Sequence, residues 1–297
     1  MSPSAGPPGP PSWAPAAPGG ESLSRLRAAA APYLPIRPLD PDGYARGHAA
    51  FEARSNQRRL LTHWLLERTF GQLGDGPLSV LSVGCGDGSV DCRLADALTA
   101  RLPDRDVTYL GLEPHAASRV AFQRRLAGLG RPGLTVHATA SGWDEAALPG
   151  RYDLVLFVHS LYYVADVAVA LQHARDVLAP GGQIIVLHAP QVGLNLLATT
   201  LAPPLAGHVQ WWAESTAAAL AGSGLQVVHD RISGALDLSV CLDPTSAEGR
   251  VVLDFTVQGR LPDGLRPAVL DVLHALRRPG STLAVEHPVD GWVLREP

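Results

Sequence analysis

The residues of this chain with the clearest chemical spacing lie in the segment LSVGCGDGSVD, residues 81–91. An apolar run enters three glycines, Gly84, Gly86 and Gly88, and glycines at such a turn let the backbone approach a ligand closely. The dinucleotide fingerprint GxGxxG would require a glycine at position 89, where this chain has Ser89. The segment therefore predicts a cofactor-binding turn between a strand and a helix, with a spacing that differs from that of dinucleotide enzymes.

A carboxylate in the next apolar run indicates that this cofactor contains a ribose. Glu113 closes the run YLGLE, and a carboxylate at the end of the second strand can accept hydrogen bonds from ribose hydroxyls. Nicotinamide enzymes and S-adenosylmethionine enzymes both use this arrangement. Asp87 inside the glycine loop would repel a pyrophosphate and attract a sulfonium, which favours S-adenosylmethionine, with S-adenosylhomocysteine as the product. A nicotinamide cofactor and a fold that binds no cofactor are the alternatives.

A parallel sheet is needed to bring these residues together. Short apolar runs alternate with helical patterns at 90–102 and 167–179, which predicts an α/β fold with a doubly wound, mostly parallel sheet. The runs are apolar on both faces, as in a sheet that is covered by helices on both sides. The predicted strands are residues 78–84, 107–113, 134–140, 152–160 and 182–189.

The segments that flank this core have weaker patterns. Residues 44–70 predict a helix packed on the main domain, because Leu60, Leu61, Trp64 and Leu65 share one helical stripe. The turn signal APGG predicts the end of a helix over 179–182. The later segments indicate helix, turn and strand over 213–230, strand or helix over 249–259, a helix over 262–278 and a last strand over 289–296.

Composition limits the functional classes. The Pro-, Ala- and Gly-rich residues 1–40 predict a disordered tail, and residues 41–297 a single domain with substrate-side additions over 190–285. A net charge of −4 predicts no nucleic-acid partner, and the absence of a long apolar run predicts no membrane span. All 24 basic residues are arginine, which excludes a lysine Schiff base. Three cysteines without a CxxC pair predict no metal site and a reducing, cytoplasmic location.

The chain resembles the class I S-adenosylmethionine-dependent methyltransferases, and more narrowly the histamine N-methyltransferases. The resemblance is carried by the glycine segment 81–91, by GLEPHAAS at 111–118 and above all by FVHSLYYVADVAVAL at 157–171. It covers the chain from about Tyr44 to the C-terminus. It implies a Rossmann-like, seven-stranded sheet with N-terminal helices and a helical and strand insertion on the substrate side.

The resemblance also implies a set of cofactor contacts. The glycine loop would cradle the methionine part, with Cys85 as a small loop residue, and Glu113 would hold the ribose. Ser141 would lie near the adenine, with Asp144 as an alternative partner for the adenine amino group, and Val158 would offer its backbone. The implied cofactor-binding residues are Gly84, Cys85, Gly86, Asp87, Gly88, Glu113, Pro114, Ser118, Ser141 and Val158.

For the substrate, the resemblance implies aromatic walls and three polar anchors, and the anchors of this chain depart from the family pattern. Where the family has a carboxylate in an N-terminal helix, this chain has Gln57, and where it has two amides, this chain has His159 and His287. The implied walls are Tyr44, Tyr162, Tyr163 and Phe255. Because a histidine titrates near neutral pH, His159 is the candidate catalytic base or orienting group; the alternative is a wall residue.

These features predict a methyltransferase that acts on a small molecule or small peptide. N-methylation of an imidazole or amine fits the resemblance best. O-methylation of a carboxylate or hydroxyl in a small natural product is the alternative, because the chain lacks the acidic anchor that would pair with a substrate cation. A nicotinamide-dependent oxidoreductase is a more distant alternative, and the sequence makes no prediction of oligomeric state.

Overall fold

A seven-stranded sheet forms the centre of the molecule, in the order β3-β2-β1-β4-β5-β7-β6. The computed structural model describes residues 19–297 apart from 71–72, 74–75 and 203–209. The first five strands are parallel, and β7 is antiparallel to both β5 and β6. The strands are β1 Leu78–Val83, β2 Val107–Leu112, β3 Leu134–Thr139, β4 Tyr152–Val158, β5 Leu178–His188, β6 Gln226–Asp237 and β7 Ala284–Arg295. The predicted doubly wound, mostly parallel sheet is confirmed.

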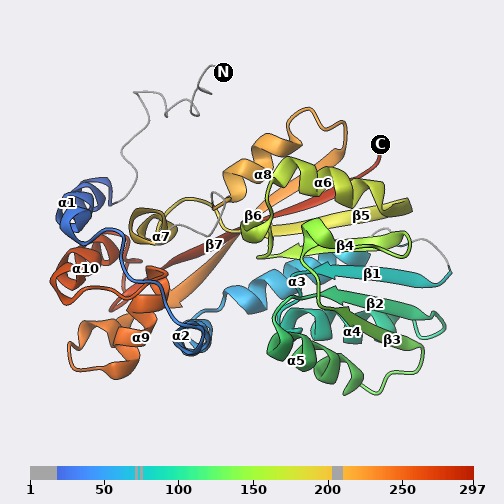
Figure 1. Cartoon of the computed structure of the whole chain (residues 1–297), viewed down its shortest axis with the longest axis horizontal. Coiled ribbons are helices and arrows are strands. Elements are labelled where there is room, and N and C mark those ends of the chain that lie inside the picture. The colour runs from blue at the N-terminus through green and yellow to red at the C-terminus, as the bar shows by residue number, and fades with distance from the viewer. Residues whose placement is uncertain (1–18, 71–72, 74–75, 203–209) are drawn as a thin grey trace.

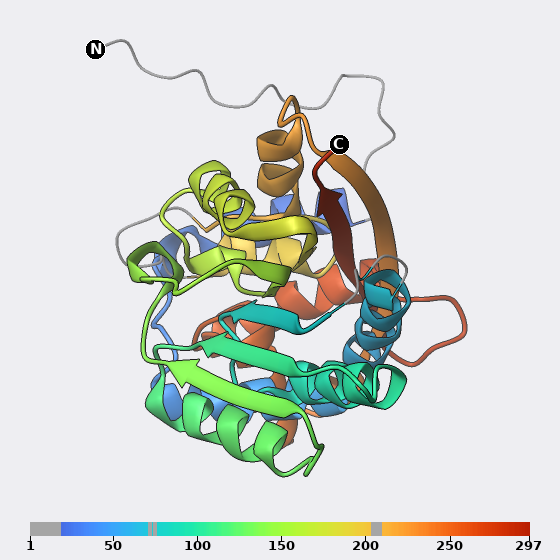
Figure 2. The same cartoon turned by 90° about the vertical axis from the view of Figure 1, so that its right-hand side faces the viewer.

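Helices cover both faces of this sheet (Figures 1 and 2). Leu65 of α3, Leu94 of α4 and Phe122 of α5 are fully buried in the core on one face, whereas Leu171 of α6 and Leu220 of α8 are buried on the other. The α-helices are α1 Gly20–Ala30, α2 Pro41–Ala53, α3 Gln57–Thr69, α4 Ser89–Arg101, α5 Ala116–Ala127, α6 Val167–Asp176, α7 Asn195–Leu201, α8 Ala213–Leu220, α9 Ala247–Thr256 and α10 Arg266–Ala275.

The long strands β6 and β7 extend beyond the parallel strands into a second cluster of helices (Figure 1). This cluster consists of α1, α2, α7, α9 and α10, and it has its own apolar core, which includes Leu26, Leu197, Leu253 and Leu273. It lies beyond the carboxyl ends of the parallel strands, where an open α/β sheet binds its ligands. The cluster therefore borders the edge at which a sheet of this kind binds its ligands.

Two local predictions need correction, and one open alternative is decided. Part of the expected tail is ordered, because residues 20–30 form α1, whose Leu23, Leu26 and Ala30 are buried against the helical cluster; residues 1–18 lie outside the described residues. Residues 44–70 form parts of two helices, α2 and α3, separated at 54–56. The segment 249–259, compatible with strand or helix, is mostly the helix α9, because its apolar residues pack on α2 at helical spacing.

A third correction concerns the start of β5. The helix expected over 167–179 ends at Asp176, and β5 begins at Leu178 and runs through the APGG segment. The pairing of β5 with β4 shifts register between Tyr152 and Leu154. The residues of the APGG segment therefore form an irregularity within β5 and not a separate turn. Within the described ranges, no helix is both long and apolar enough to cross a membrane.

Candidate active site

The order of the strands reverses between β1 and β4, so the segments that follow these two strands face each other. Gly84 follows β1, and Ser160 follows β4 by two residues. A Cβ built on Gly84 would lie 2.6 Å from the Cβ of Ser160, and Gly84 has a φ of 64°. Both the close approach and the left-handed backbone require glycine here. The glycine loop and the His159 segment are therefore neighbours in space.

The glycine loop leaves room for a ligand at one position and packs tightly at another. A Cβ on Gly86 would meet nothing within 4 Å, whereas a Cβ on Gly88 would lie 2.8 Å from the ring of Phe122. The helix α4 begins directly after the loop at Ser89, so its first N–H groups face the same space. Open space above Gly86 next to a helix N-terminus fits the methionine part of S-adenosylmethionine.

Glu113 is held directly beside this loop. One of its carboxylate oxygens accepts a hydrogen bond from the backbone N–H of Gly86 at 3.0 Å, and the other accepts from the N–H of His115 at 2.8 Å. Each carboxylate oxygen can accept more than one hydrogen bond, so both keep a free lone pair. The two backbone bonds orient the carboxylate at the ends of β1 and β2, where a ribose would present its hydroxyls.

The structure gives Asp87 a different role from the one expected. Its carboxylate forms an ion pair with Arg125 of α5 at 2.8 Å and accepts a hydrogen bond from the backbone N–H of Ser89 at 3.0 Å. The charge of Asp87 is thus neutralised by an arginine, and it stabilises the start of α4. The argument that this carboxylate attracts a sulfonium is not supported by this geometry.

Cys85 is a buried residue of the loop. Its sulfur lies only 2.6 Å from the position that a Cβ on Gly111 would occupy, which shows how tightly the thiol is packed. Burial raises the pKa of the Cys85 thiol, so the nucleophilic thiolate is disfavoured. A role as a small loop residue is in keeping with this environment.

The other predicted cofactor residues lie on the loops around this edge of the sheet. Pro114 and Ser118 sit at the start of α5, where the Ser118 hydroxyl contacts Nδ1 of His115 at 2.9 Å. Ser141 follows β3 and donates to the carbonyl of Gly142 at 2.9 Å. Of the two adenine candidates, Asp144 already accepts a hydrogen bond from the backbone N–H of Ala165 at 2.9 Å. Val158 ends β4.

Sequence reasoning missed Arg58, which lies against the same loop. The guanidinium of Arg58 donates to the hydroxyl of Ser89 at the start of α4, and it forms an ion pair with Glu52 of α2 at 2.6 Å. An arginine beside a helix N-terminus is well placed for a carboxylate, so Arg58 would hold the carboxylate of the methionine part. The only sequence signal was its position next to Gln57 at the start of a helix.

His159 has an unusual backbone and an unpartnered ring nitrogen. It adopts a φ of 53°, in the region that favours glycine, and its backbone N–H donates to the carbonyl of Leu187 at 2.8 Å. Nδ1 contacts the Tyr162 hydroxyl at 3.0 Å, while Nε2 is buried without a hydrogen-bond partner among the described residues. Burial, followed by the charge of Arg58, lowers the pKa of His159 to about 4. The imidazole is therefore neutral near pH 7.

A second buried histidine lies behind this pair. His188, at the end of β5, contacts the hydroxyl of Thr216 through Nδ1 at 2.9 Å, and its ring packs edge-on against Tyr162 with centroids 4.5 Å apart. Burial and the neighbouring His159 lower its pKa to about 3. From the sequence, His188 is left out of the predicted site, because a histidine at the end of a strand is more often structural.

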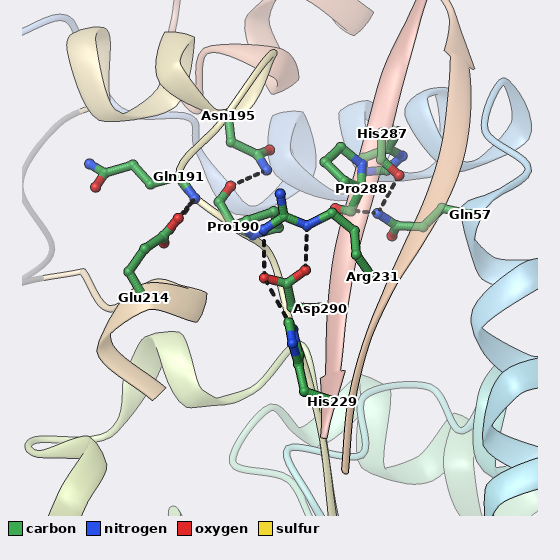
Figure 3. A network of polar contacts seen from close by, with 10 residues as sticks. All are labelled: Gln57, Pro190, Gln191, Asn195, Glu214, His229, Arg231, His287, Pro288 and Asp290. Atoms are coloured by element: carbon green, nitrogen blue, oxygen red, sulfur yellow. Dashed lines mark hydrogen bonds and ion pairs between the residues drawn. The ribbon is translucent and has the colours of Figure 1, made fainter. Parts of the chain in front are cut away.

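Gln57 and His287 meet between α3 and β7. Gln57 is buried, and its amide nitrogen donates to the backbone carbonyls of His287 at 3.1 Å and Pro288 at 3.2 Å (Figure 3). Nδ1 of His287 contacts the Ser55 hydroxyl at 2.7 Å. Burial, together with His159, lowers the pKa of His287 to about 3. The two predicted anchors His159 and His287 are thus close enough to influence each other.

The predicted aromatic walls separate into two groups. Phe255 of α9 is surrounded by Tyr44, His48 and Phe51 of α2, with ring centroids 5.1–5.6 Å from its own. Tyr162 is half-buried and stacks on His159 with ring centroids 6.2 Å apart, whereas the adjacent Tyr163 is 60% exposed. His48 and Phe51 had not been predicted, although they share a helical stripe with Tyr44.

A separate polar network joins the two strands at the edge of the sheet (Figure 3). Asp290 of β7 is buried and forms a bidentate ion pair with Arg231 of β6, at 2.6 and 2.8 Å. Nε2 of His229 lies 3.7 Å from the same carboxylate. This network forms one wall of a hollow of about 430 Å³ beside α8, which lies away from the glycine loop. Its ion pair holds the register of β6 against β7.

The fold and this site define a class I, Rossmann-like methyltransferase. The family model described as "Methyltransferase domain" matches residues 52–230, which is more than half of the chain. The chain therefore belongs to the methyltransferase-domain family, and it uses S-adenosylmethionine as its methyl donor. This result replaces the nicotinamide alternative.

Among curated proteins the chain is similar to histamine N-methyltransferases. It is 23% identical to the histamine N-methyltransferase of Xenopus tropicalis over 203 residues, which is 61% of this chain. The match spans 66% of the length of that relative, just under two thirds. It is 22% identical to histamine N-methyltransferase B of Xenopus laevis, covering 74% and 80%. Among solved structures, the YcgJ protein of Bacillus subtilis has a TM-score of 0.52 at 12% identity, covering 80% of this chain and 98% of its own. The similarity to the YcgJ protein shows only that the fold is shared.

Proposed function

We propose that this chain transfers a methyl group to a ring nitrogen or amine of a small molecule or short peptide, with an imidazole as the preferred acceptor. The observation that carries this proposal is the pair of histidine anchors, half-buried His159 and buried His287, each with Nδ1 against a hydroxyl, that of Tyr162 and that of Ser55. Their pKa values are lowered to about 4 for His159 and about 3 for His287. Burial disfavours the protonated form of these rings. The same environment would keep a bound substrate imidazole neutral, with its lone pair free to react.

The residues of the site would orient the acceptor more than activate it. S-adenosylmethionine supplies an electrophilic methyl group when bound, so the protein has to align the lone pair and exclude water. A histidine with a pKa of about 4 is a weak base at neutral pH, which favours an orienting role for His159. Tyr44 and Phe255 would cover the planar ring, and Tyr163 would close its exposed side.

The histamine N-methyltransferase relatives support the N-methylation proposal, but one anchor argues against histamine itself. Gln57 is an uncharged amide, and its nitrogen is already committed to two backbone carbonyls. A substrate ammonium would find no partner charge at this position. O-methylation of a carboxylate remains the second candidate, because an uncharged anchor does not repel an acidic substrate.

The test is a screen for S-adenosylhomocysteine release across imidazoles, amines, carboxylic acids, phenols and short histidine peptides. Product mass and NMR would locate the new methyl group. We expect N-methylimidazole products, and methyl esters or ethers as the only products would overturn the proposal in favour of O-methylation. His159→Gln should lower kcat at least tenfold, because the loss of its interaction with the acceptor costs about 1.5 kcal/mol. The affinity for S-adenosylhomocysteine should not change.

The expected location is the cytoplasm. Cys85, Cys92 and Cys241 are free thiols, which supports a reducing compartment.

A further inference from the structure

The hydroxyl of Tyr162 determines which nitrogen of His159 carries the proton. The Tyr162 oxygen accepts a hydrogen bond from the backbone N–H of Ala189 at 3.0 Å, so its own proton is left for its other neighbour. That neighbour is Nδ1 of His159 at 3.0 Å. A neutral imidazole that accepts at Nδ1 carries its proton at Nε2. Nε2 of His159, which is buried and has no partner in the described part of the chain, is therefore a hydrogen-bond donor.

The same arrangement recurs at His287 with a different hydroxyl. The Ser55 oxygen accepts from the backbone N–H of Gln57 at 3.1 Å and lies 2.7 Å from Nδ1 of His287. The serine proton is satisfied by donation to Nδ1, which again leaves the proton of the neutral ring on Nε2. His159, which follows β4, and His287, in β7, thus share one tautomer, and each offers one N–H donor.

The nearest ion pair at this end of the site has no net charge. The carboxylate of Glu52 is paired with Arg58 at 2.6 Å, and Gln57 contributes an uncharged amide. A buried N–H donor without a partner costs about 1–3 kcal/mol, and that cost is recovered when an acceptor binds. A carboxylate is a matching acceptor for two N–H donors, because both of its oxygens can accept and the bonds are charge-assisted.

Building on the proposed function, we propose that the substrate carries a carboxylate held between the Nε2–H groups of His159 and His287, with Tyr162 and Ser55 as positioning residues that fix these tautomers. The substrate class is then an imidazole or a related ring with an acidic side chain, in place of the ammonium side chain of histamine. No bond to the carboxylate forms or breaks in this proposal, since the methyl group goes to the ring nitrogen.

The tautomers can be measured directly by ¹⁵N NMR on protein labelled at histidine, at pH 7 and with S-adenosylhomocysteine added. His159→Gln and His287→Gln assign the two rings by the loss of one signal set each. We expect a protonated Nε2 and an unprotonated Nδ1 in both rings. A protonated Nδ1 in either ring would refute the proposal, and this measurement needs neither substrate nor turnover.

Calorimetry on the S-adenosylhomocysteine complex tests the substrate class with two matched pairs of probes. The first pair is imidazole-4-acetate and histamine, and the second is phenylacetate and phenethylamine. The acid of each pair should bind at least roughly tenfold more tightly than the amine, as expected for one charge-assisted hydrogen bond. Equal binding, no binding by any of the probes, or preference for the amines would overturn the carboxylate proposal.

The second pair separates this inference from the proposed function. If no imidazole is methylated but phenylacetate still binds more tightly than phenethylamine, N-methylation of imidazoles fails and the carboxylate site stands. If imidazoles are methylated without any acid preference, the proposed function stands and this inference fails.

A positioning role for Tyr162 predicts a change in selectivity. Tyr162→Phe removes the hydroxyl that orients Nδ1, so the ratio of acid to amine affinity should fall at least fivefold, while S-adenosylhomocysteine affinity stays the same. Tyr152→Phe is the matched control, because the Tyr152 hydroxyl lies at the opposite end of β4 and is buried with no hydrogen-bond partner among the residues that the structure describes. An unchanged ratio in a folded Tyr162→Phe protein would remove Tyr162 from this role.

Discussion

We expect cofactor binding to depend most directly on Glu113, because its carboxylate is already oriented by two backbone N–H groups. Glu113→Gln keeps the size of the side chain but removes its charge and one acceptor oxygen. S-adenosylhomocysteine affinity should fall at least tenfold, since a hydrogen bond to a charged group contributes about 1.5–3 kcal/mol. Calorimetry measures this, with the exposed Glu67→Gln on α3 as the control. Unchanged affinity would exclude Glu113 from the ribose site.

The buried histidines predict a dependence of stability on pH. In the folded protein the pKa values are about 4 for His159 and about 3 for His188 and His287, below the value of about 6.5 in the unfolded chain. Between these values the unfolded chain binds more protons. The stabilisation is therefore complete above about pH 6.5 and is lost as the pH falls towards the folded-state pKa values.

Urea unfolding between pH 7.5 and pH 5 measures this effect. Each histidine should contribute up to about 1.4 kcal/mol per pH unit to the fall in the free energy of unfolding. In His188→Gln, the free energy of unfolding should depend less steeply on pH, by the contribution of one histidine. His63→Gln, on the exposed side of α3, should leave the slope as it is in the wild type. A pH-independent free energy of unfolding over this range would contradict the assignment of neutral, buried rings.

At the scale of elements, the substrate side depends on how closely α2 approaches α9. A Cβ on Gly47 would lie 2.8 Å from the Cβ of Phe255, so only glycine permits this distance. Gly47→Val should push the helices apart and destabilise the fold by about 1–3 kcal/mol. We expect a higher KM for the acceptor and unchanged S-adenosylhomocysteine affinity, because the glycine loop lies on the sheet.

The control for this helix is Ala49→Val, at an exposed position of α2. It adds the same β-branched side chain without meeting α9. Steady-state kinetics and calorimetry on both variants give the two readouts. A loss of cofactor affinity in Gly47→Val equal to the change in KM would show that the two sides of the site are not separate.

At the scale of the whole molecule, two apolar cores share the strands β6 and β7, one around the parallel sheet and one in the helical cluster (Figure 1). The helix α1 belongs to the second core, where Leu26 is completely buried. Leu26→Ala should therefore lower the free energy of unfolding by about 2–5 kcal/mol. Leu34→Ala, at a residue that is 44% exposed, is the control and should change it little. Equal stability of the two variants would place α1 outside the folded unit.

The parallel part of the sheet was predictable because its information is local. Each strand from 78 to 189 is a short apolar run that ends in a turn or a polar residue, and the alternation with helices leaves few possible topologies. The glycine loop and Glu113 follow from the same pattern, since the ends of neighbouring parallel strands meet at one edge. The less periodic segments were harder: the helix α9 is defined by its packing on α2, and α1 by its contacts with α10.

By itself, the sequence determined the class of fold, the residues at the carboxyl edge of the sheet and the nature of the methyl donor, because all three depend on spacing along the chain. Only the tertiary structure decided how those residues behave. It paired Asp87 with Arg125, brought Arg58 to Ser89, and placed the hydroxyl of the distant Ser55 against Nδ1 of His287. Charge compensation and proton position depend on neighbours in space, and no pattern along the chain specifies them.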